Sequence, residues 1–216
     1  MHMQRLLSLV FVGSAVILMS FTNAATTGKE KPAKAVTRTK KATTFQVDKN
    51  LSKLNWAGKN LTGQRTGTIG VSEGKLDLEN NVLKGGNFSL DIHSIAVTDI
   101  KDAAMNAKLV THLKSDDFFD AEKFPTARFV ITKVDAKGND TYDVTGNLTI
   151  KGITHPITFP ATVAVSNNKL TAKADIVVDR SKFNVRFGSK SFFAGIGDKA
   201  IYDDFDLAVE LVANAR

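Results

Sequence analysis

Hydrophobic and polar residues alternate along most of the chain between residues 45 and 216, as they do in β-strands that bury one face. The longest alternating runs lie at 87–93, 142–151, 157–166, 170–178 and 205–211. Shorter strands are predicted at 45–48, 53–58, 66–71, 75–79 and 127–134. This part of the chain is therefore predicted to be an all-β domain whose strands each turn one side toward an apolar interior.

Turn-forming residues separate the runs, notably at 80–81, 137–140 and 166–168. Because these connections are short, successive strands are predicted to pair as antiparallel hairpins. About eight or nine such strands predict an up-and-down barrel, and a two-sheet sandwich is the alternative. A barrel of about eight strands either is filled by side chains or holds one small ligand, so the function depends on what occupies the interior.

One segment departs from the alternation. Residues 102–115 carry Ala, Leu and Met at helical spacing, which predicts a short helix that begins near Asp99 or Asp102. The helix leads into an unusual run, 115–129, in which four phenylalanines stand among acidic residues. Phenylalanine gains about 1.5–3 kcal/mol from burial, whereas unpaired carboxylates stay at the surface. The run is therefore predicted to be a lid or junction whose rings plug the interior.

The aromatic composition also points to an apolar interior. The chain has 14 Phe against 2 Tyr and 1 Trp. Rings without a polar group suit an apolar cavity, whereas polar small molecules need convergent donors and acceptors. A packed, Phe-rich core fits the same composition, so composition alone leaves a hollow and a filled barrel open.

The first 24 residues are predicted to be a cleaved export signal. Arg5 precedes an apolar run at 6–21, and Thr22-Asn23-Ala24 then gives a small-x-small cleavage pattern. A transmembrane anchor is the alternative, but the run is shorter than the ~20 residues that a span usually needs. The sequence contains no cysteine, which excludes a lipid-modified N-terminal cysteine and disulfides. The protein is therefore predicted to be periplasmic and not a lipoprotein.

Residues 25–44 are predicted to be a basic, disordered linker, because they are mostly Thr, Ala and Lys. Of the net charge of +7, the predicted signal contributes +1 and this linker +5, which leaves +1 for residues 45–216. The domain thus lacks the basic surplus of a nucleic-acid-binding protein, and we expect no nucleic-acid partner. Peripheral contact of the linker with anionic lipid is one role for it, and a solvated spacer is the favoured one.

The sequence offers little for catalysis or metal binding. His93, His112 and His155 follow the predicted signal, but they fall in different elements and lack metal-ligand spacing. The chain has no phosphate loop, dinucleotide fingerprint or nucleophile elbow. We assign Arg180 to an ion pair with a carboxylate such as Asp179, which would fix a loop, in preference to ligand binding. We therefore expect no metal site and no enzyme activity.

Four stretches of the chain resemble the YceI-like family of exported lipid-binding proteins. They match the family's His-Leu-x-Ser-x-Asp-Phe-Phe segment, its aromatic-Pro-Thr-x-x-Phe strand entry, its Gly-x-Leu-Thr-x-x-Gly-x-Thr-x-Pro hairpin and its Arg-Ser-x-Phe loop. In this sequence they are His112–Asp120, Phe124–Phe129, Gly146–Ile157 and Asp179–Phe183. The four stretches follow one another in the family's order within the predicted domain at 45–216.

The resemblance implies an extended, lipocalin-like antiparallel barrel that encloses a long apolar tunnel, often as a homodimer, without a cofactor or catalysis. The chain is thus predicted to sequester or carry a long apolar lipid of the polyisoprenoid or isoprenoid quinone class. The residues predicted to line the tunnel are Trp56, Phe88, Leu90, Ile92, Phe118, Phe119, Phe129, Ile131, Leu148, Phe159, Ile176, Phe183 and Phe193. A ligand-free barrel that acts as a stress-related interaction module is the alternative, and a lipid-modifying enzyme is a less favoured one.

Overall fold

The computed structural model describes residues 41–216. The predicted export signal and residues 25–40 of the predicted linker lie outside the described residues. The first strand, β1, takes in residues 42–44, which were predicted to belong to the linker. The folded barrel therefore begins at Ala42, three residues before the expected position.

Residues 41–216 form nine strands, one α-helix and two short 3₁₀ helices. The strands are β1 (Ala42–Val47), β2 (Lys53–Asn60), β3 (Gly63–Glu79), β4 (Val82–Val97), β5 (Thr126–Gly138), β6 (Thr141–Ile150), β7 (Ile153–Ser166), β8 (Lys169–Asp179) and β9 (Ile201–Ala215). The helices are α1 (Ala103–Lys114), η1 (Arg180–Phe183) and η2 (Gly197–Lys199).

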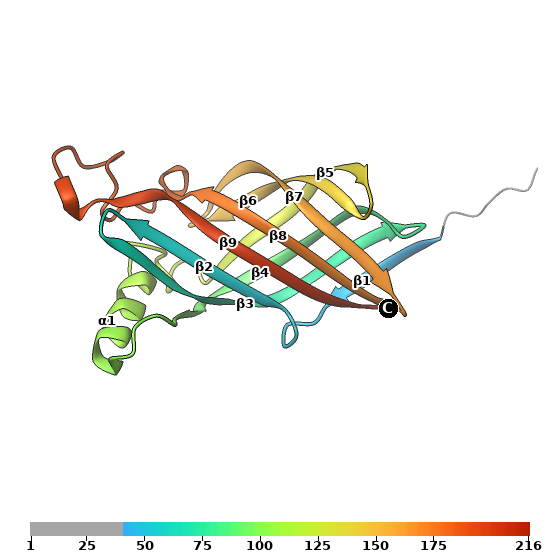
Figure 1. The fold of residues 1–216 in the computed structure, drawn as a ribbon, viewed down its shortest axis with the longest axis horizontal. Helices are drawn as coiled ribbons and strands as arrows, with labels where there is room; N and C mark the ends of the chain where they lie inside the picture. The colour runs from blue at the N-terminus through green and yellow to red at the C-terminus, as the bar shows by residue number, and fades with distance from the viewer. Residues whose placement is uncertain (1–40) are drawn as a thin grey trace, which may run out of the picture. The chain divides into compact units, whose positions relative to one another are not determined.

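The strands close into an antiparallel, up-and-down barrel, as predicted (Figure 1). The sheet runs β1-β3-β2-β9-β8-β7-β6-β5-β4, and pairing of β3 with β4 closes it. Nine strands occupy eight positions around the barrel, because β1 and β2 follow one another in the gap between β3 and β9. β2 pairs with the first part of both neighbours, and β1 pairs with their last part.

The β3 strand is longer than predicted. Runs at 66–71 and 75–79 were expected as two strands, but they belong to one strand from Gly63 to Glu79. Register shifts at Thr68/Gly70 and Val71/Glu73 mark bulges in its pairing with β4. A bulge bends a strand without ending it, so the interruption in alternation at this point marks curvature of the barrel wall.

The predicted turns are confirmed by their backbone conformation. Asn80 and Asn81 have φ angles of 52° and 64°, and Asn167 and Asn168 have φ angles of 49° and 60°. Two consecutive left-handed residues form the tight turn whose twist suits an antiparallel hairpin, and asparagine tolerates this conformation well. These asparagines therefore fix the register of the β3–β4 and β7–β8 hairpins.

The predicted helix is also present, and it covers one end of the barrel (Figure 1). The side chain of Asp102 caps it by accepting a hydrogen bond from the Met105 amide at 2.8 Å. The side-chain amide of Asn106 donates to the carbonyl oxygens of Val97 and Ile100 at 2.9 and 3.0 Å. These bonds fasten α1 to the end of β4.

The two ends of the barrel differ. We call the end that carries α1, the β2–β3 and β6–β7 turns and residues 180–200 the helix end; the C-terminus lies at the other end (Figure 1). At this opposite end the interior is packed with buried side chains from strands on several sides, among them Phe45, Leu76, Leu78, Leu83, Tyr142, Leu170 and Ala213. The barrel is therefore filled away from the helix end.

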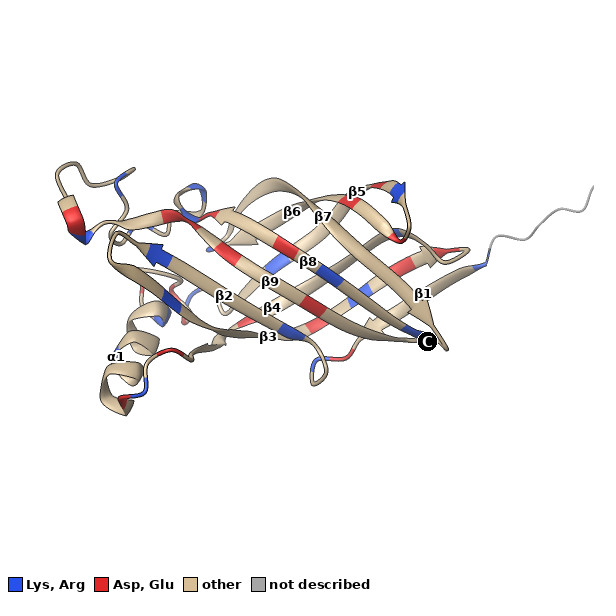
Figure 2. Cartoon of the chain, viewed as in Figure 1, with Lys and Arg blue, Asp and Glu red and all other residues tan. Residues whose placement is uncertain are grey.

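Charged residues are spread along the strands of the barrel wall (Figure 2). Several of them pair across neighbouring strands, such as Lys59 with Asp206 at 2.6 Å and Lys173 with Glu210 at 2.9 Å. The hydrogen bond and the charge of Lys173 lower the pKa of Glu210. These exposed ion pairs keep the polar face of each strand in solvent while the apolar face turns inward.

Candidate functional site

A cavity of about 290 Å³ lies inside the helix end of the barrel. Its lining is mostly apolar and comes from seven strands, from α1 and from the segments that follow α1 and β8. The apolar lining residues are Trp56, Ile69, Leu90, Ile92, Ile95, Leu109, Leu113, Phe118, Phe119, Ala127, Leu148, Ile150, Val178, Val185, Ile201, Phe205 and Leu207. The cavity is therefore built from the inward faces of strands that reach the helix end.

The cavity reaches solvent at the β2–β3 hairpin. Exposed polar residues of this hairpin belong to the lining, together with Tyr202, whose side chain is 44% exposed. The polar hairpin residues are Lys59, Asn60, Thr62, Gln64 and Arg65. The cavity thus has a polar mouth at the helix end and an apolar interior.

A second space of about 30 Å³ lies deeper in the barrel. Leu90, Ala127, Leu148, Val178 and Leu207 line both spaces, which places the two in line along the barrel. We call the two neighbouring spaces together the channel; they share part of an apolar wall between the mouth and the filled end.

Aromatic rings surround the deeper space. Phe88 and Phe129 line it, with ring centroids 5.3 Å apart, and Phe159 packs on Phe129 at 5.4 Å. Gly146 leaves room for the Phe129 ring, because a Cβ atom at this position would overlap it. The ring positions therefore depend on the absence of a side chain at Gly146.

Residues 115–129, which we call the plug segment, close one side of the cavity. Phe118 is 7% exposed and lines the cavity, and Phe119 lines it beside Phe118. The Phe118 ring contacts His112 of α1 and Phe187 of the loop after η1, with centroids 5.0 and 5.2 Å away. The acidic residues of the segment lie toward solvent. The carboxylate of Asp117 lies 3.0 Å from His112 Nε2, within hydrogen-bond distance. The predicted division between buried rings and exposed acids is thus present.

Lys151, in the β6–β7 turn, holds the plug segment from the other side. Its Nζ donates to the carbonyl oxygen of Asp116 at 3.0 Å. Partial burial lowers the pKa of Lys151, and the nearby carboxylates of Asp120 and Asp116 oppose this effect. The lysine thus links the turn to the segment that carries Phe118.

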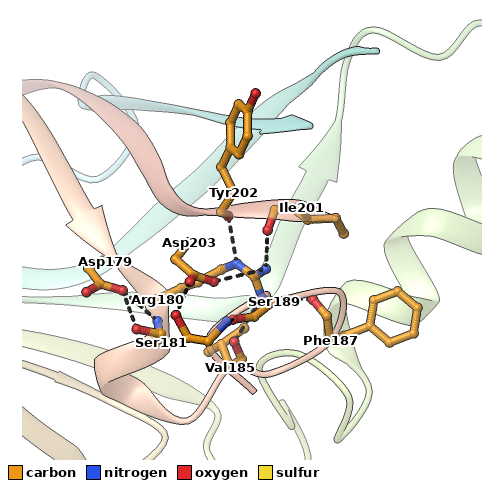
Figure 3. Close-up of polar contacts among 10 residues, drawn as sticks. Asp179, Arg180, Ser181, Val185, Phe187, Ser189, Ile201, Tyr202 and Asp203 are labelled. Carbon is orange, nitrogen blue, oxygen red and sulfur yellow. Dashed lines mark hydrogen bonds and ion pairs between the residues drawn. The ribbon is translucent and has the colours of Figure 1, made fainter. Parts of the chain in front are cut away.

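Arg180 fixes the loop beside the cavity (Figure 3). Its guanidinium is buried and donates to the carbonyl oxygens of Tyr202, Val185, Phe187 and Ile201 at 2.8–3.1 Å. Burial lowers the pKa of Arg180, which the neighbouring carboxylates partly offset. The side chain therefore ties the segment after η1 to the start of β9.

The carboxylate partner of Arg180 differs from the one suggested by the sequence. Arg180 lies 3.6 Å from Asp203, whereas Asp179 accepts hydrogen bonds from the amide and hydroxyl of Ser181 and caps η1 (Figure 3). Asp179 thus starts the 3₁₀ helix, and the ion pair of Arg180 reaches across to β9.

The structure brings most of the predicted tunnel residues together. Trp56, Leu90, Ile92, Phe118, Phe119 and Leu148 line the larger space, and Phe88, Phe129 and Ile176 line the deeper one. Ile131 and Phe159 pack in or against the core without lining either space. Phe183 is fully buried against His155, and Phe193 is 49% exposed on the loop between η1 and η2. Phe193 therefore lies outside the cavity.

Several lining residues were not predicted from the sequence. Ile150, Val178, Phe205 and Leu207 occupy inward positions of the alternating runs, so the pattern could have identified them. Leu109 and Leu113 are four residues apart on α1, a spacing that places them on one face of a helix. No comparable signal marks Val185 or Ile201, which are brought to the cavity by the loop that Arg180 ties down.

The histidines do not converge in the cavity. His93 is exposed, His112 packs against Phe118 and Phe187, and His155 packs against Phe183. Within residues 41–216, no three His, Asp or Glu side chains are grouped so that they could hold a metal ion. The same part of the chain contains no helix that is both long and apolar enough to cross a membrane.

Comparison with known proteins extends the sequence resemblance to most of the chain. The family model described as the YceI-like domain matches residues 45–213. A UPF0312 protein from Pseudomonas putida F1 is 45% identical over 85 residues, and one from Vibrio vulnificus YJ016 is 45% identical over 83 residues. These matches cover 36% and 35% of this chain, and the chain spans 44% of the length of each relative.

Solved structures share the fold. Burkholderia cenocepacia BcnA is 26% identical, with a TM-score of 0.65 over 78% of this chain and 99% of that one. A structure described as a polyisoprenoid binding domain from Saccharophagus degradans has a TM-score of 0.59 over 80% of this chain and 98% of that one, at 12% identity. The second likeness concerns the fold alone.

Proposed function

The chain belongs to the YceI-like domain family, and we propose that it is a binding protein, not an enzyme, that holds a long apolar lipid inside its barrel. The observation that carries this proposal is the apolar channel that opens at the helix end. Burial of apolar ligand surface there contributes about 25 cal/mol per Å², before the costs of association. A polar small molecule would instead need donors and acceptors that converge inside the cavity.

The interior offers such a ligand no free charged group. Among the charged residues that line the two spaces, Arg180 is the buried one, and Arg128 is exposed on the barrel wall. The guanidinium of Arg180 already donates to four carbonyl oxygens and is paired with Asp203. The polar groups of the lining lie at the mouth, on the β2–β3 hairpin. We therefore place the apolar chain of the ligand in the channel and its polar head at the mouth.

The arrangement of the two spaces suits a chain-like ligand. They lie in line and share five lining residues, and the larger is near the lower end of the range for small-molecule sites, about 300–1,000 Å³. A narrow channel accepts a linear apolar chain more easily than a fused ring system. The polyisoprenoid or isoprenoid quinone class fits this shape, and the Saccharophagus domain with this fold is described as polyisoprenoid-binding.

Three further parts of the hypothesis remain predictions. The export signal at 1–24 would place the protein in the periplasm. The basic linker would contact anionic lipid if it has a role beyond that of a spacer. A homodimer is implied by the resemblance to the family.

The decisive experiment identifies the bound lipid directly. The protein is purified without detergent, extracted with organic solvent and analysed by mass spectrometry. We expect one apolar lipid class in stoichiometric amount. Recovery of no stoichiometric lipid would contradict the proposal and favour the ligand-free interaction module.

A pair of variants tests whether the lipid occupies the channel. Leu148 lines both spaces, so Leu148→Trp should obstruct the channel and reduce the recovered lipid severalfold. Leu148→Met keeps the volume of the side chain and should leave the recovered lipid unchanged. Equal lipid content in the two variants would place the ligand elsewhere.

A further inference from the structure

Exposed aromatic residues gather on one loop beside the cavity mouth. Within residues 41–216, the exposed large aromatic side chains are Phe187, Phe192, Phe193 and Tyr202, with exposed fractions of 39–49%. We call residues 186–202 the aromatic loop; it lies at the helix end of the barrel (Figure 1). Large apolar groups that cluster at one surface site mark contact with a partner or a membrane.

The loop is built so that two of these rings stay outside. The amide of Phe193 donates to the carbonyl oxygen of Ser189 at 3.0 Å, and Ser189 is fully buried. Ser191 donates its hydroxyl to Asp203 at 2.6 Å. These bonds hold the turn that presents Phe192 and Phe193 to solvent, although burial would favour both rings.

Basic residues accompany the rings. Residues 182–199 contain Lys182, Arg186, Lys190 and Lys199 against one acid, Asp198, which gives the segment a net charge of +3. This contrasts with a net charge of +1 for all of residues 45–216. The guanidinium of Arg186 lies 4.9 Å from the centre of the Phe192 ring. Aromatic rings interleaved with basic groups are the combination that binds the interface of an anionic bilayer.

The β2–β3 hairpin adds a second apolar contact at the same mouth. Leu61, at its tip, is 48% exposed and stands between the lining residues Asn60 and Thr62. Tyr202 belongs both to the aromatic loop and to the lining. The exposed apolar groups thus border the opening through which a lipid would enter.

We propose that the aromatic loop and the tip of the β2–β3 hairpin form a docking face that seats the cavity mouth on an anionic phospholipid bilayer. Phe192, Phe193 and Leu61 enter the headgroup region, and Lys190 and Lys199 lie against the phosphate groups. The channel then opens directly into the apolar layer, so a lipid chain passes between bilayer and barrel without crossing water. The purpose of this face rests on the proposed function, but the docking itself is measurable without any bound lipid.

Cosedimentation with vesicles tests the docking. The probe is an equimolar mixture of phosphatidylethanolamine and phosphatidylglycerol, compared with pure phosphatidylcholine. Phe192→Ser with Phe193→Ser should weaken binding to the mixed vesicles about tenfold. The control replaces Leu51 and Val82, which are also exposed but lie away from the helix end, in the β1–β2 connection and at the start of β4. Leu51→Ser with Val82→Ser should leave binding unchanged.

A second pair of variants tests the charge. Lys190→Glu with Lys199→Glu should weaken binding to the anionic vesicles about tenfold at low salt, and the difference should shrink as salt is added. Lys84→Glu with Lys169→Glu makes the same change of charge at the opposite end and should have a much smaller effect. All proteins carry the same N-terminal residues, so any contribution of the basic linker is common to them.

The outcomes separate docking from the proposed function. Vesicle binding that depends on the aromatic loop, with no lipid in the organic extract, would support docking and contradict the lipid-binding function. Stoichiometric lipid in a protein that binds neither vesicle would contradict docking alone. Equal vesicle binding by the loop variants and their controls would also contradict docking. So would a wild-type protein that does not bind vesicles but forms a dimer in light scattering, if Phe192→Ser with Phe193→Ser abolishes that dimer.

Discussion

The guanidinium of Arg180 lies 3.6 Å from the carboxylate of Asp203, and Asp203 Oδ1 is buried without a hydrogen-bond partner among the described residues. The pair joins the start of η1 to β9 below the loop that borders the cavity. A buried charge without its partner is costly, so each group restricts the position of the other. The same guanidinium holds four carbonyl oxygens, which makes Arg180 the centre of this part of the wall.

Replacing Arg180 should destabilise the protein strongly. Arg180→Met leaves the four carbonyl oxygens without their donor and Asp203 without its cationic partner, and we expect the free energy of unfolding to fall by about 3–5 kcal/mol. Arg180→Lys keeps the charge but cannot reach all the acceptors, so its free energy of unfolding should lie between those of wild type and Arg180→Met. Urea unfolding followed by fluorescence measures the difference. A lysine variant as stable as wild type would show that the charge alone suffices.

The space left by Gly146 should prove essential for the ring arrangement. In Gly146→Ala, the new Cβ would overlap the Phe129 ring and lie 2.6 Å from the carbonyl oxygen of Val130. We expect a loss of about 1–3 kcal/mol in the free energy of unfolding. Gly85→Ala is the matched control, because a Cβ there meets nothing within 4 Å, and it should change stability by less than about 1 kcal/mol. Equal stability of the two variants would contradict the packing described around Phe129.

Alternation predicted the barrel well because its strands bury one face and expose the other. The runs at 142–151, 157–166 and 170–178 correspond closely to β6, β7 and β8. Alternation could not reveal that β1 and β2 share one position in the barrel, since this depends on pairing with β3 and β9. It also could not show where the interior is hollow, because side chains of similar type fill one end and line a cavity at the other.

The loop residues were the hardest to place from sequence. Phe193 was predicted to line the tunnel, yet it lies 49% exposed on an irregular segment where no period relates a residue to a face. Arg180 was correctly assigned to fixing a loop, but its carboxylate partner is Asp203, 23 positions along the chain. The two meet because β9 returns beside η1. Spacing along the sequence carries no information about such contacts.

Acid should weaken the hydrogen bonds that hold the β2–β3 hairpin to the segment before α1. Asp99 accepts hydrogen bonds from the Thr66 amide and from Arg65, each at 3.0 Å. Desolvation alone would raise the pKa of Asp99, but these hydrogen bonds outweigh it and hold the pKa below its ordinary value of 3.8. Because the folded-state pKa is depressed, the stabilising contribution is present above the ordinary value and is lost as pH falls through the folded value.

The variant Asp99→Asn tests whether the stabilisation by Asp99 is lost in acid. It should lower the free energy of unfolding by about 1 kcal/mol at neutral pH, and the difference from wild type should shrink near about pH 3. Glu73→Gln, on an exposed position of β3, controls for the loss of a carboxylate. A difference for Asp99→Asn that grows in acid would contradict the assignment.

The plug segment supplies the last prediction. Phe118 is buried between the cavity, His112 and Phe187, so a charged side chain at this position would either be driven out of the barrel or disturb the mouth. Phe118→Asp should therefore abolish retention of the bound lipid, as measured in organic extracts, whereas Phe118→Leu keeps an apolar group and should retain most of it. Circular dichroism establishes that both variants keep the barrel. Full retention in a folded Phe118→Asp protein would mean that the ring seals the helix end without contacting lipid.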